Sequence, residues 1–313
     1  MKPAASVLLL TTATGFGFGL LAWLGAYCAV GFLPTHARLF VATGVGISLA
    51  LISLGLGASV FHLERKERAW RAFSQWRSSW LSREGIAGVL SYPVAIAFAL
   101  ALWRDEPPLW TRLLGVVLVL VSLGTVYCTA MIYASLKPIR QWHNAHTAAD
   151  YLIYAVFSGA VLYALLNTVA HGTAGTVASV AAVTSAGIAL LAKRAYWRHI
   201  DAQAPLATLA AAIGMPGGAE ARALDAPHFT ENFVLRQMGF SIARRHAKKL
   251  RRIALAIGFA LPLACSVLAG CALLPLATAS LAVLCAGGGL LLERWLFFAE
   301  ATHVAAVYYG RKI

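Results

Sequence analysis

Residues 39–62 read LFVATGVGISLALISLGLGASVFH, a run of twenty-four residues without Lys, Arg, Asp or Glu. About 20 apolar residues in a helix are enough to cross the hydrocarbon layer of a bilayer. The whole chain shares this character, because 60% of its 313 residues are hydrophobic and only 12% are charged. In soluble domains about 45–50% of the residues are apolar and about 25% are charged. We therefore predict an integral membrane protein, and we exclude a soluble enzyme and a disordered chain.

Eight apolar stretches of this kind follow one another along the chain. They cover residues 6–33, 39–62, 84–103, 110–136, 149–170, 174–192, 253–273 and 276–296. The predicted fold class is all-α, an integral membrane bundle of eight transmembrane helices with both termini on the same side. We expect one membrane domain over residues 1–313, with loops on the side of the termini at about residues 63–83, 137–148 and 193–252.

Lys and Arg are distributed unevenly between the two sides of this predicted bundle. Of 26 such residues, 23 fall on the side of the termini, and only Arg38, Arg104 and Arg112 fall on the other. Cytoplasmic loops are enriched in Lys and Arg, so both termini are predicted to be cytoplasmic. The net charge of +14 is then a feature of topology and of contact with anionic lipid. No nucleic-acid-binding motif accompanies the charge, so nucleic acid is not expected as a partner.

The sequence offers few residues for metal or redox chemistry. The five cysteines lie in apolar stretches without Cys-x-x-Cys spacing, so they are interpreted as small core residues rather than disulfides or metal ligands. None of the nine histidines falls in the middle of a predicted span, where a b-type haem would need two that face each other. We therefore predict neither haem nor a metal site in this chain.

Two titratable residues bracket the predicted loop 63–83. His62 ends the second span, and Glu84 begins the third. Ionisable groups at membrane depth are costly unless they have a role or a partner. The structural alternative is that Glu84 is only a favourable charge at a helix start, with Ser82 as the N-cap. In that interpretation the loop tryptophans form an interfacial aromatic belt.

Two other segments end at the same predicted depth. Residues 133–142 close the fourth span, and residues 293–303 continue the eighth, with Glu293, Phe297 and Glu300 on one helix face. Polar and aromatic groups from four helices would thus collect in one layer. Such a layer suits an amphipathic ring that carries hydrogen-bonding oxygens and an apolar tail, and a quinone fits this description.

The stretch around His62 and Glu84, which contains Leu81-Ser82-Arg83-Glu84, resembles the membrane anchor subunit of dimethyl sulfoxide reductase. The eight spans and the segments 133–142 and 293–303 are similar to the same family, so the resemblance covers essentially the whole chain. It implies a subunit of the bacterial inner membrane that is not catalytic alone. Within its complex it would bind and oxidise menaquinol or ubiquinol in anaerobic respiration, without haem.

The resemblance also implies partners and site residues. The partners would be a ferredoxin-like subunit with four [4Fe–4S] clusters and a molybdopterin catalytic subunit, docked on loops 63–83 and 193–252. The family's quinol-site histidine falls on His62 and its glutamate on Glu84, which become the predicted catalytic residues. The predicted quinol site is completed by Arg83, Trp80, Tyr133 and Glu293.

Two alternative functions remain open. The same anchor could serve the reverse flow, in which a dehydrogenase such as formate dehydrogenase reduces quinone. A secondary transporter would instead place its site at mid-bilayer on broken helices, and residues 15–19 and 91–93 are candidate breaks. Glycines such as those at 15, 17 and 19 are also common where membrane helices pack tightly. The terminal substrate belongs to the catalytic subunit and is not encoded in this chain.

Overall fold

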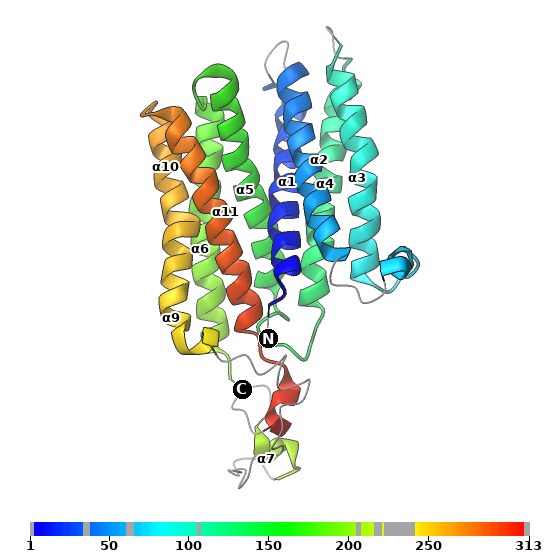
Figure 1. The fold of residues 1–313 in the computed structure, drawn as a ribbon, viewed down its shortest axis with the longest axis vertical. Helices are drawn as coiled ribbons and strands as arrows, with labels where there is room; N and C mark the ends of the chain where they lie inside the picture. Colours follow the sequence, from blue (N-terminus) through cyan, green and yellow to red (C-terminus); the bar gives the residue numbers. More distant parts are fainter. Residues whose placement is uncertain are drawn as a thin grey trace.

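The computed structural model describes residues 3–33, 38–60, 66–104, 108–204, 208–215, 221 and 242–309. Across these ranges the chain is helical and contains no strand. Eight helical segments have the length and hydropathy needed to cross a membrane, which confirms the predicted fold class. Both ends of the chain lie at one end of the bundle (Figure 1), which we call the terminal side.

The spanning helices follow in chain order. They are α1 Ala5–Ala29, α2 Arg38–Val60, α3 Trp80–Leu102, α4 Trp110–Ala134, α5 Ala145–His171, α6 Thr176–Ala202, the continuous segment α9 Ile242–Leu255, η2 Ala256–Ala260 and α10 Leu261–Gly270, and α11 Pro275–Ala299. Three short helices lie on the terminal side: η1 Lys66–Phe73, α7 Leu209–Ala212 and η3 Val304–Tyr309.

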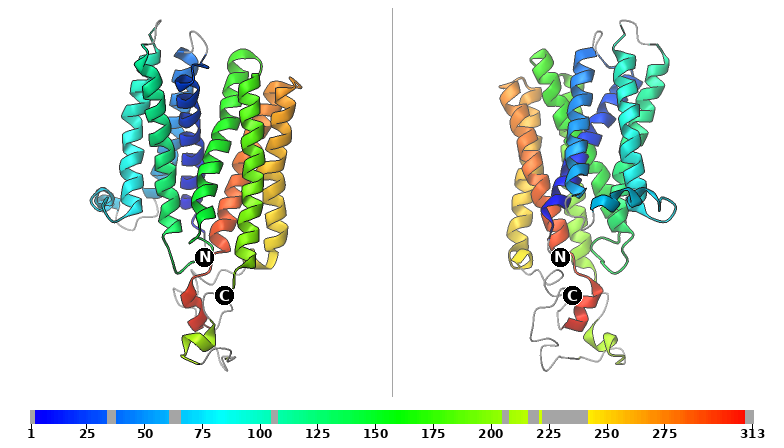
Figure 2. Two further views of the ribbon diagram at one scale, coloured as in Figure 1. Left: turned by 180° about the vertical axis from the view of Figure 1, so that it is seen from behind. Right: turned by 45° about the vertical axis from the view of Figure 1, so that its right-hand side comes forward.

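The bundle consists of two groups of helices that lie side by side (Figures 1 and 2). Helices α1 to α4 form one group, and α5, α6, α9–α10 and α11 form the other. The two groups meet mainly where α1 packs along α5. Across this contact the ring of Tyr27 on α1 stacks on that of Tyr163 on α5, with 4.3 Å between the ring centres, and the Trp23 indole of α1 donates to the Val156 carbonyl of α5 at 2.8 Å. The α1–α5 contact therefore decides how the two groups are placed relative to each other.

Two glycines set the distance between α1 and α5. A Cβ atom on Gly19 would lie 1.9 Å from the carbonyl oxygen of Ala155, and one on Gly159 would lie 2.1 Å from the carbonyl carbon of Gly19. Only glycine permits such a close approach of two backbones. Helix α1 also continues through residues 15–19, and α3 continues through Pro93. Neither stretch is therefore the helix break that a transporter would need.

The start of α3 differs from the prediction. The helix begins at Trp80, so Glu84 lies in its second turn rather than at its first residue. The N-cap is Ser79, whose side chain accepts from the backbone nitrogen of Ser82. The Ser82 hydroxyl instead donates to the carbonyl of Ala72. This bond ties the end of η1 to α3, so the second half of loop 63–83 folds back onto the helix.

The predicted loop 193–252 is wrong at both of its ends. Helix α6 continues to Ala202, and α9 begins at Ile242. Helix α6 extends beyond the predicted end of the span because its buried face continues past residue 192. The buried residues on this face include Ala186, Ala189, Lys193, Tyr196 and Ile200. The basic residues after position 244 form the first turns of a spanning segment.

Candidate functional site

Of the two predicted catalytic residues, the structure describes Glu84, and His62 lies outside the described residues. The Glu84 side chain is 4% exposed. Its Oε1 atom accepts a hydrogen bond of 2.6 Å from the Thr129 hydroxyl of α4. Among the described residues no basic side chain forms a salt bridge with it. The interpretation of Glu84 as an ordinary charge at a helix start is therefore wrong, because such a charge would face solvent.

Arg83 and Trp80 lie in the first turn of the same helix, and the Arg83 side chain binds the preceding loop rather than Glu84. The Arg83 guanidinium donates to the carbonyls of Trp76, at 2.8 Å, and Arg77, at 2.7 Å. It also lies 4.3 Å from the centre of the Trp80 ring, which packs edge-on against Tyr127. In the described structure neither residue is joined to the Glu84 carboxyl by a hydrogen bond. These two predicted site residues thus anchor the α2–α3 connection to α3.

Tyr133 belongs to an aromatic cluster on the terminal side. Its ring centre lies 5.3 Å from that of Trp142, 5.2 Å from that of Phe298 and 5.9 Å from that of Tyr151. The Trp142 indole donates to the carbonyl of Phe297 at 3.0 Å. The segments 133–142 and 293–303 therefore come together as predicted, and their contact joins α4 to the end of α11.

Glu293, the last predicted site residue, lies in a buried ion cluster. Its side chain is fully buried, as is that of Lys193 on α6, with which it forms a salt bridge. The neighbouring Arg294 is also buried, and its Nε atom lies 2.7 Å from Oε2 of Glu293. Asp150, buried on α5, is close enough to interact electrostatically with all three. Its Oδ2 atom accepts a hydrogen bond of 3.1 Å from the hydroxyl of Tyr154.

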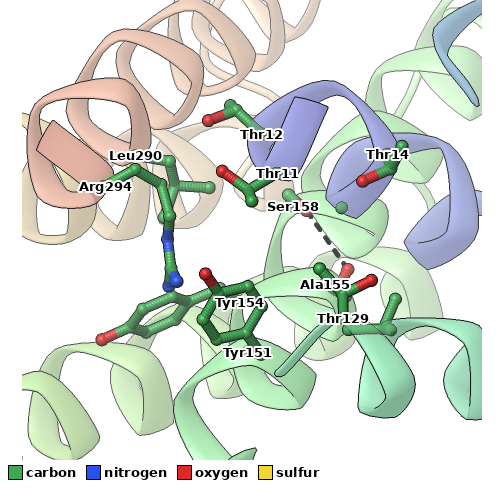
Figure 3. Close-up of a pocket in the computed structure, with 12 residues that line it drawn as sticks. Thr11, Thr12, Thr14, Thr129, Tyr151, Tyr154, Ala155, Ser158, Leu290 and Arg294 are labelled. Carbon is green, nitrogen blue, oxygen red and sulfur yellow. Dashed lines mark hydrogen bonds between the residues drawn. The ribbon is translucent and has the colours of Figure 1, made fainter. Parts of the chain in front are cut away.

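Aromatic rings surround the two cations of this cluster. The Lys193 ammonium lies 4.1 Å from the centre of the Tyr196 ring and 4.7 Å from that of Trp197. The Arg294 guanidinium lies 4.0 Å from the centre of the Tyr151 ring, as Figure 3 shows. Such cation–π contacts are stronger when the cation is desolvated. They compensate part of the cost of burying the charges.

Sequence reasoning missed three members of this cluster, Asp150, Lys193 and Arg294. The predicted boundaries place Asp150 and Arg294 at the ends of spans 149–170 and 276–296 and Lys193 at the first residue of loop 193–252. Two signals could have found them. The buried stripe of α6 passes through Lys193 at helical spacing, and a glutamate within a span requires a partner of opposite charge.

A small cavity is bordered by Thr129, the partner of Glu84, and by Arg294 of the ion cluster (Figure 3). Its volume is about 20 Å³, enough for one water molecule. The polar residues that line it come from α1, α4, α5 and α11; they are Thr11, Thr12, Thr14, Thr129, Tyr151, Tyr154, Ser158 and Arg294. The buried Thr12 hydroxyl has no hydrogen-bond partner among the described residues. Buried polar groups are usually satisfied, and a water in this cavity would satisfy it.

The fold and the site together define a class, a multi-pass membrane subunit with buried titratable groups near one membrane face. Comparison with known sequences is more specific. The sequence pattern of the family described as "DMSO reductase anchor subunit (DmsC)" matches residues 6–299. The chain belongs to this family.

Two relatives illustrate the range of the family. The chain is 34% identical to the C subunit of sulfite dehydrogenase of Allochromatium vinosum, in an alignment that covers 99% of each protein. It is 28% identical to the C component of the anaerobic dimethyl sulfoxide reductase of Haemophilus influenzae, over 42% of this chain and 48% of the other. As a member of an anchor family, the chain associates with catalytic and electron-transfer subunits and with the membrane.

Proposed function

We propose that the chain is the quinone-reactive anchor of a sulfite-oxidising complex and that it reduces quinone. The observation that carries the proposal is Glu84, a buried carboxyl with a single hydroxyl partner near one membrane face of an anchor subunit. The full-length similarity to a sulfite dehydrogenase subunit supports the direction of electron flow. The resemblance to the dimethyl sulfoxide reductase anchor favoured quinol oxidation. The similarity to a sulfite dehydrogenase subunit now leads us to prefer the alternative in which electrons flow to quinone.

The proposed reaction balances electrons and protons. Oxidation of sulfite with one water gives sulfate, two protons and two electrons in a molybdopterin subunit. A ferredoxin-like subunit with [4Fe–4S] clusters passes the electrons to this anchor, where a menaquinone or ubiquinone takes up two electrons and two protons. The partial match to a component of dimethyl sulfoxide reductase supports a second candidate function, in which the same site oxidises quinol.

Glu84 is proposed to donate a proton to the reduced quinone. A buried carboxyl can act as a general acid when it lies within hydrogen-bond reach of the reacting oxygen. The cavity beside Thr129 has room for a water but not for a quinone ring. We therefore place the ring on the side of Glu84 that faces the α2–α3 connection, which includes His62. His62, which lies outside the described residues, is the proposed donor of the second proton because the family's quinol-site histidine falls on it and an imidazole titrates near neutral pH.

Glu84→Gln tests this proposal, because glutamine keeps the shape of the side chain and removes the acidic proton that the carboxyl can donate. We expect quinone reduction by the assembled complex to fall by roughly 10²–10⁴-fold, the usual contribution of a general acid. Electron transfer from sulfite to a water-soluble acceptor should be unchanged, since it bypasses the anchor. Glu67→Gln, at an exposed carboxylate of η1, is the matched control. A Glu84→Gln complex that reduces quinone at the normal rate would contradict the proposal.

The terminal side is proposed to face the cytoplasm and to carry the soluble partners. The support is the excess of Lys and Arg on that side, together with η1 and α7, which lie there. Cys271 is an exposed native thiol at the C-cap of α10, and this end of α10 lies opposite the terminal side (Figure 1). Ser74 is an exposed position that directly follows η1. In spheroplasts an impermeant maleimide should label Cys271, but it should label a Ser74→Cys variant that also carries Cys271→Ser only after permeabilisation. The reverse pattern would show that the orientation is inverted.

A further inference from the structure

Two buried carboxyls are connected to the same cavity by hydroxyl groups. Thr129 lines the cavity and donates to Glu84 at 2.6 Å. Tyr154 lines it as well and donates to Asp150 at 3.1 Å. Figure 3 shows both residues on the wall of the cavity, Thr129 from α4 and Tyr154 from α5. A single water between these walls would complete a chain of exchangeable protons from one carboxyl to the other.

The charges of the ion cluster single out Asp150 as the group that can gain and lose a proton. Glu293 forms ion pairs with both Lys193 and Arg294, so two cations share one anion. An ionised Asp150 makes the cluster neutral, and a protonated Asp150 leaves one positive charge. Within the described residues Asp150 forms no salt bridge, and its Oδ1 atom has no hydrogen-bond partner. Its proton is therefore not excluded by a direct cationic contact.

We propose that Asp150 resupplies the proton that Glu84 gives to quinone. The inference rests on the proposed function, because it needs Glu84 to lose a proton in each turnover. Thr129 would pass its hydroxyl proton to the Glu84 carboxylate and take one from the cavity water. When Asp150 is protonated, its carboxyl donates to Tyr154 and the Tyr154 hydroxyl turns from Asp150 to the water. The water then takes the proton of Tyr154, and Tyr154 takes the proton of Asp150. The net change is one proton moved from Asp150 to Glu84, with no electron transferred.

Asp150 would recover its proton from the terminal side. It lies in the second turn of α5, and Thr147, one turn earlier, is on the same helix face. The buried Thr147 hydroxyl also has no hydrogen-bond partner among the described residues. The next residue towards the surface is the N-cap Asn144, whose side chain accepts from the backbone nitrogen of Thr147. This end of α5 therefore gives a short polar route from the membrane face to Asp150.

The test uses Asp150→Asn in the complete complex, supplied with sulfite and a short-chain quinone. The proton already held by Glu84 should support a first turnover at the wild-type rate. Later turnovers should be roughly tenfold slower or more, since proton resupply now limits them. Their rate should also show a larger solvent deuterium isotope effect than in the wild type. Stopped-flow measurement of quinol formation separates the first turnover from those that follow.

Variants of the hydroxyl groups make the test independent of Asp150 itself. Tyr154→Phe and Thr129→Val should each slow the later turnovers, and they carry the test if Asp150→Asn does not assemble. Thr14→Val is the matched control, because Thr14 lines the same cavity but donates to the Leu10 carbonyl of its own helix at 2.7 Å. It should behave as the wild type does.

Two outcomes would overturn the inference. One is a normal rate and a normal isotope effect over many turnovers in the assembled Asp150→Asn and Tyr154→Phe complexes. The other is an equal slowing of the first and later turnovers, which indicates a structural role only. If Glu84→Gln is inactive in the same assay, the proposed function stands without the relay. An active Glu84→Gln complex would instead contradict the proposed function itself.

Discussion

The Glu293→Gln variant is expected to lose about 3–5 kcal/mol of folding free energy, because it leaves buried cations without their shared anion. Lys193 and Glu293 are fully buried, and Arg294 is nearly so. Water therefore cannot replace the lost carboxylate. The loss is measurable as a lower midpoint of thermal unfolding in detergent and as less folded protein in the membrane.

A double variant separates the charge effect from simple loss of packing. Lys193→Met combined with Glu293→Gln leaves Arg294 and Asp150, one cation and one anion. This balanced pair should recover much of the stability lost in Glu293→Gln. Asp201→Asn is the control, because its side chain is 60% exposed in its salt bridge with Arg251. Exposed pairs contribute about 0–1 kcal/mol. Equal stabilities of Glu293→Gln and Asp201→Asn would show that the buried cluster does not stabilise the fold.

The Gly159→Val variant is expected to separate the two groups of helices. Even the Cβ atom alone would lie 2.1 Å from the carbonyl carbon of Gly19, and backbone atoms cannot rotate away as a side chain can. Overpacking inside a core typically costs about 1–3 kcal/mol, and a backbone clash at the main contact between the groups should exceed that range. We expect little folded protein, measured by size-exclusion chromatography of a fluorescent fusion in mild detergent.

A glycine-to-valine change at an open position should be tolerated, which makes a direct comparison possible. A Cβ atom on Gly46 of α2 would meet no atom within 4 Å, so Gly46→Val should accumulate as the wild type does. Gly159→Ala should fall between the two valine variants, since it adds the clashing atom without the branched methyl groups. Normal accumulation of Gly159→Val would mean that α1 and α5 do not approach as closely as the structure places them.

Local features of the sequence were sufficient to predict the eight spanning helices. Hydrophobicity over about 20 residues depends only on neighbours in the chain, and the spanning segments could therefore be recognised without knowing what they pack against. Helix ends were less certain. Glu84 was expected at the first residue of its helix, but α3 starts at Trp80. Ser79, rather than Ser82, caps it, because Ser82 bonds to η1 across a turn that has no strong local signal.

The sequence alone also placed Glu84 and Glu293 in the same membrane layer, since depth follows from position along a spanning helix. What these carboxyls contact follows only from the folded molecule. Lys193 and Glu293 are separated by 100 residues, and Glu84 and Thr129 by 45. A lysine near a helix end looks the same in sequence whether it reaches water or a buried glutamate. The packing of α5, α6 and α11 removes the water around Lys193 and Glu293. Helices α1, α4, α5 and α11 together enclose the cavity that borders Thr129 and Tyr154, the partners of Glu84 and Asp150.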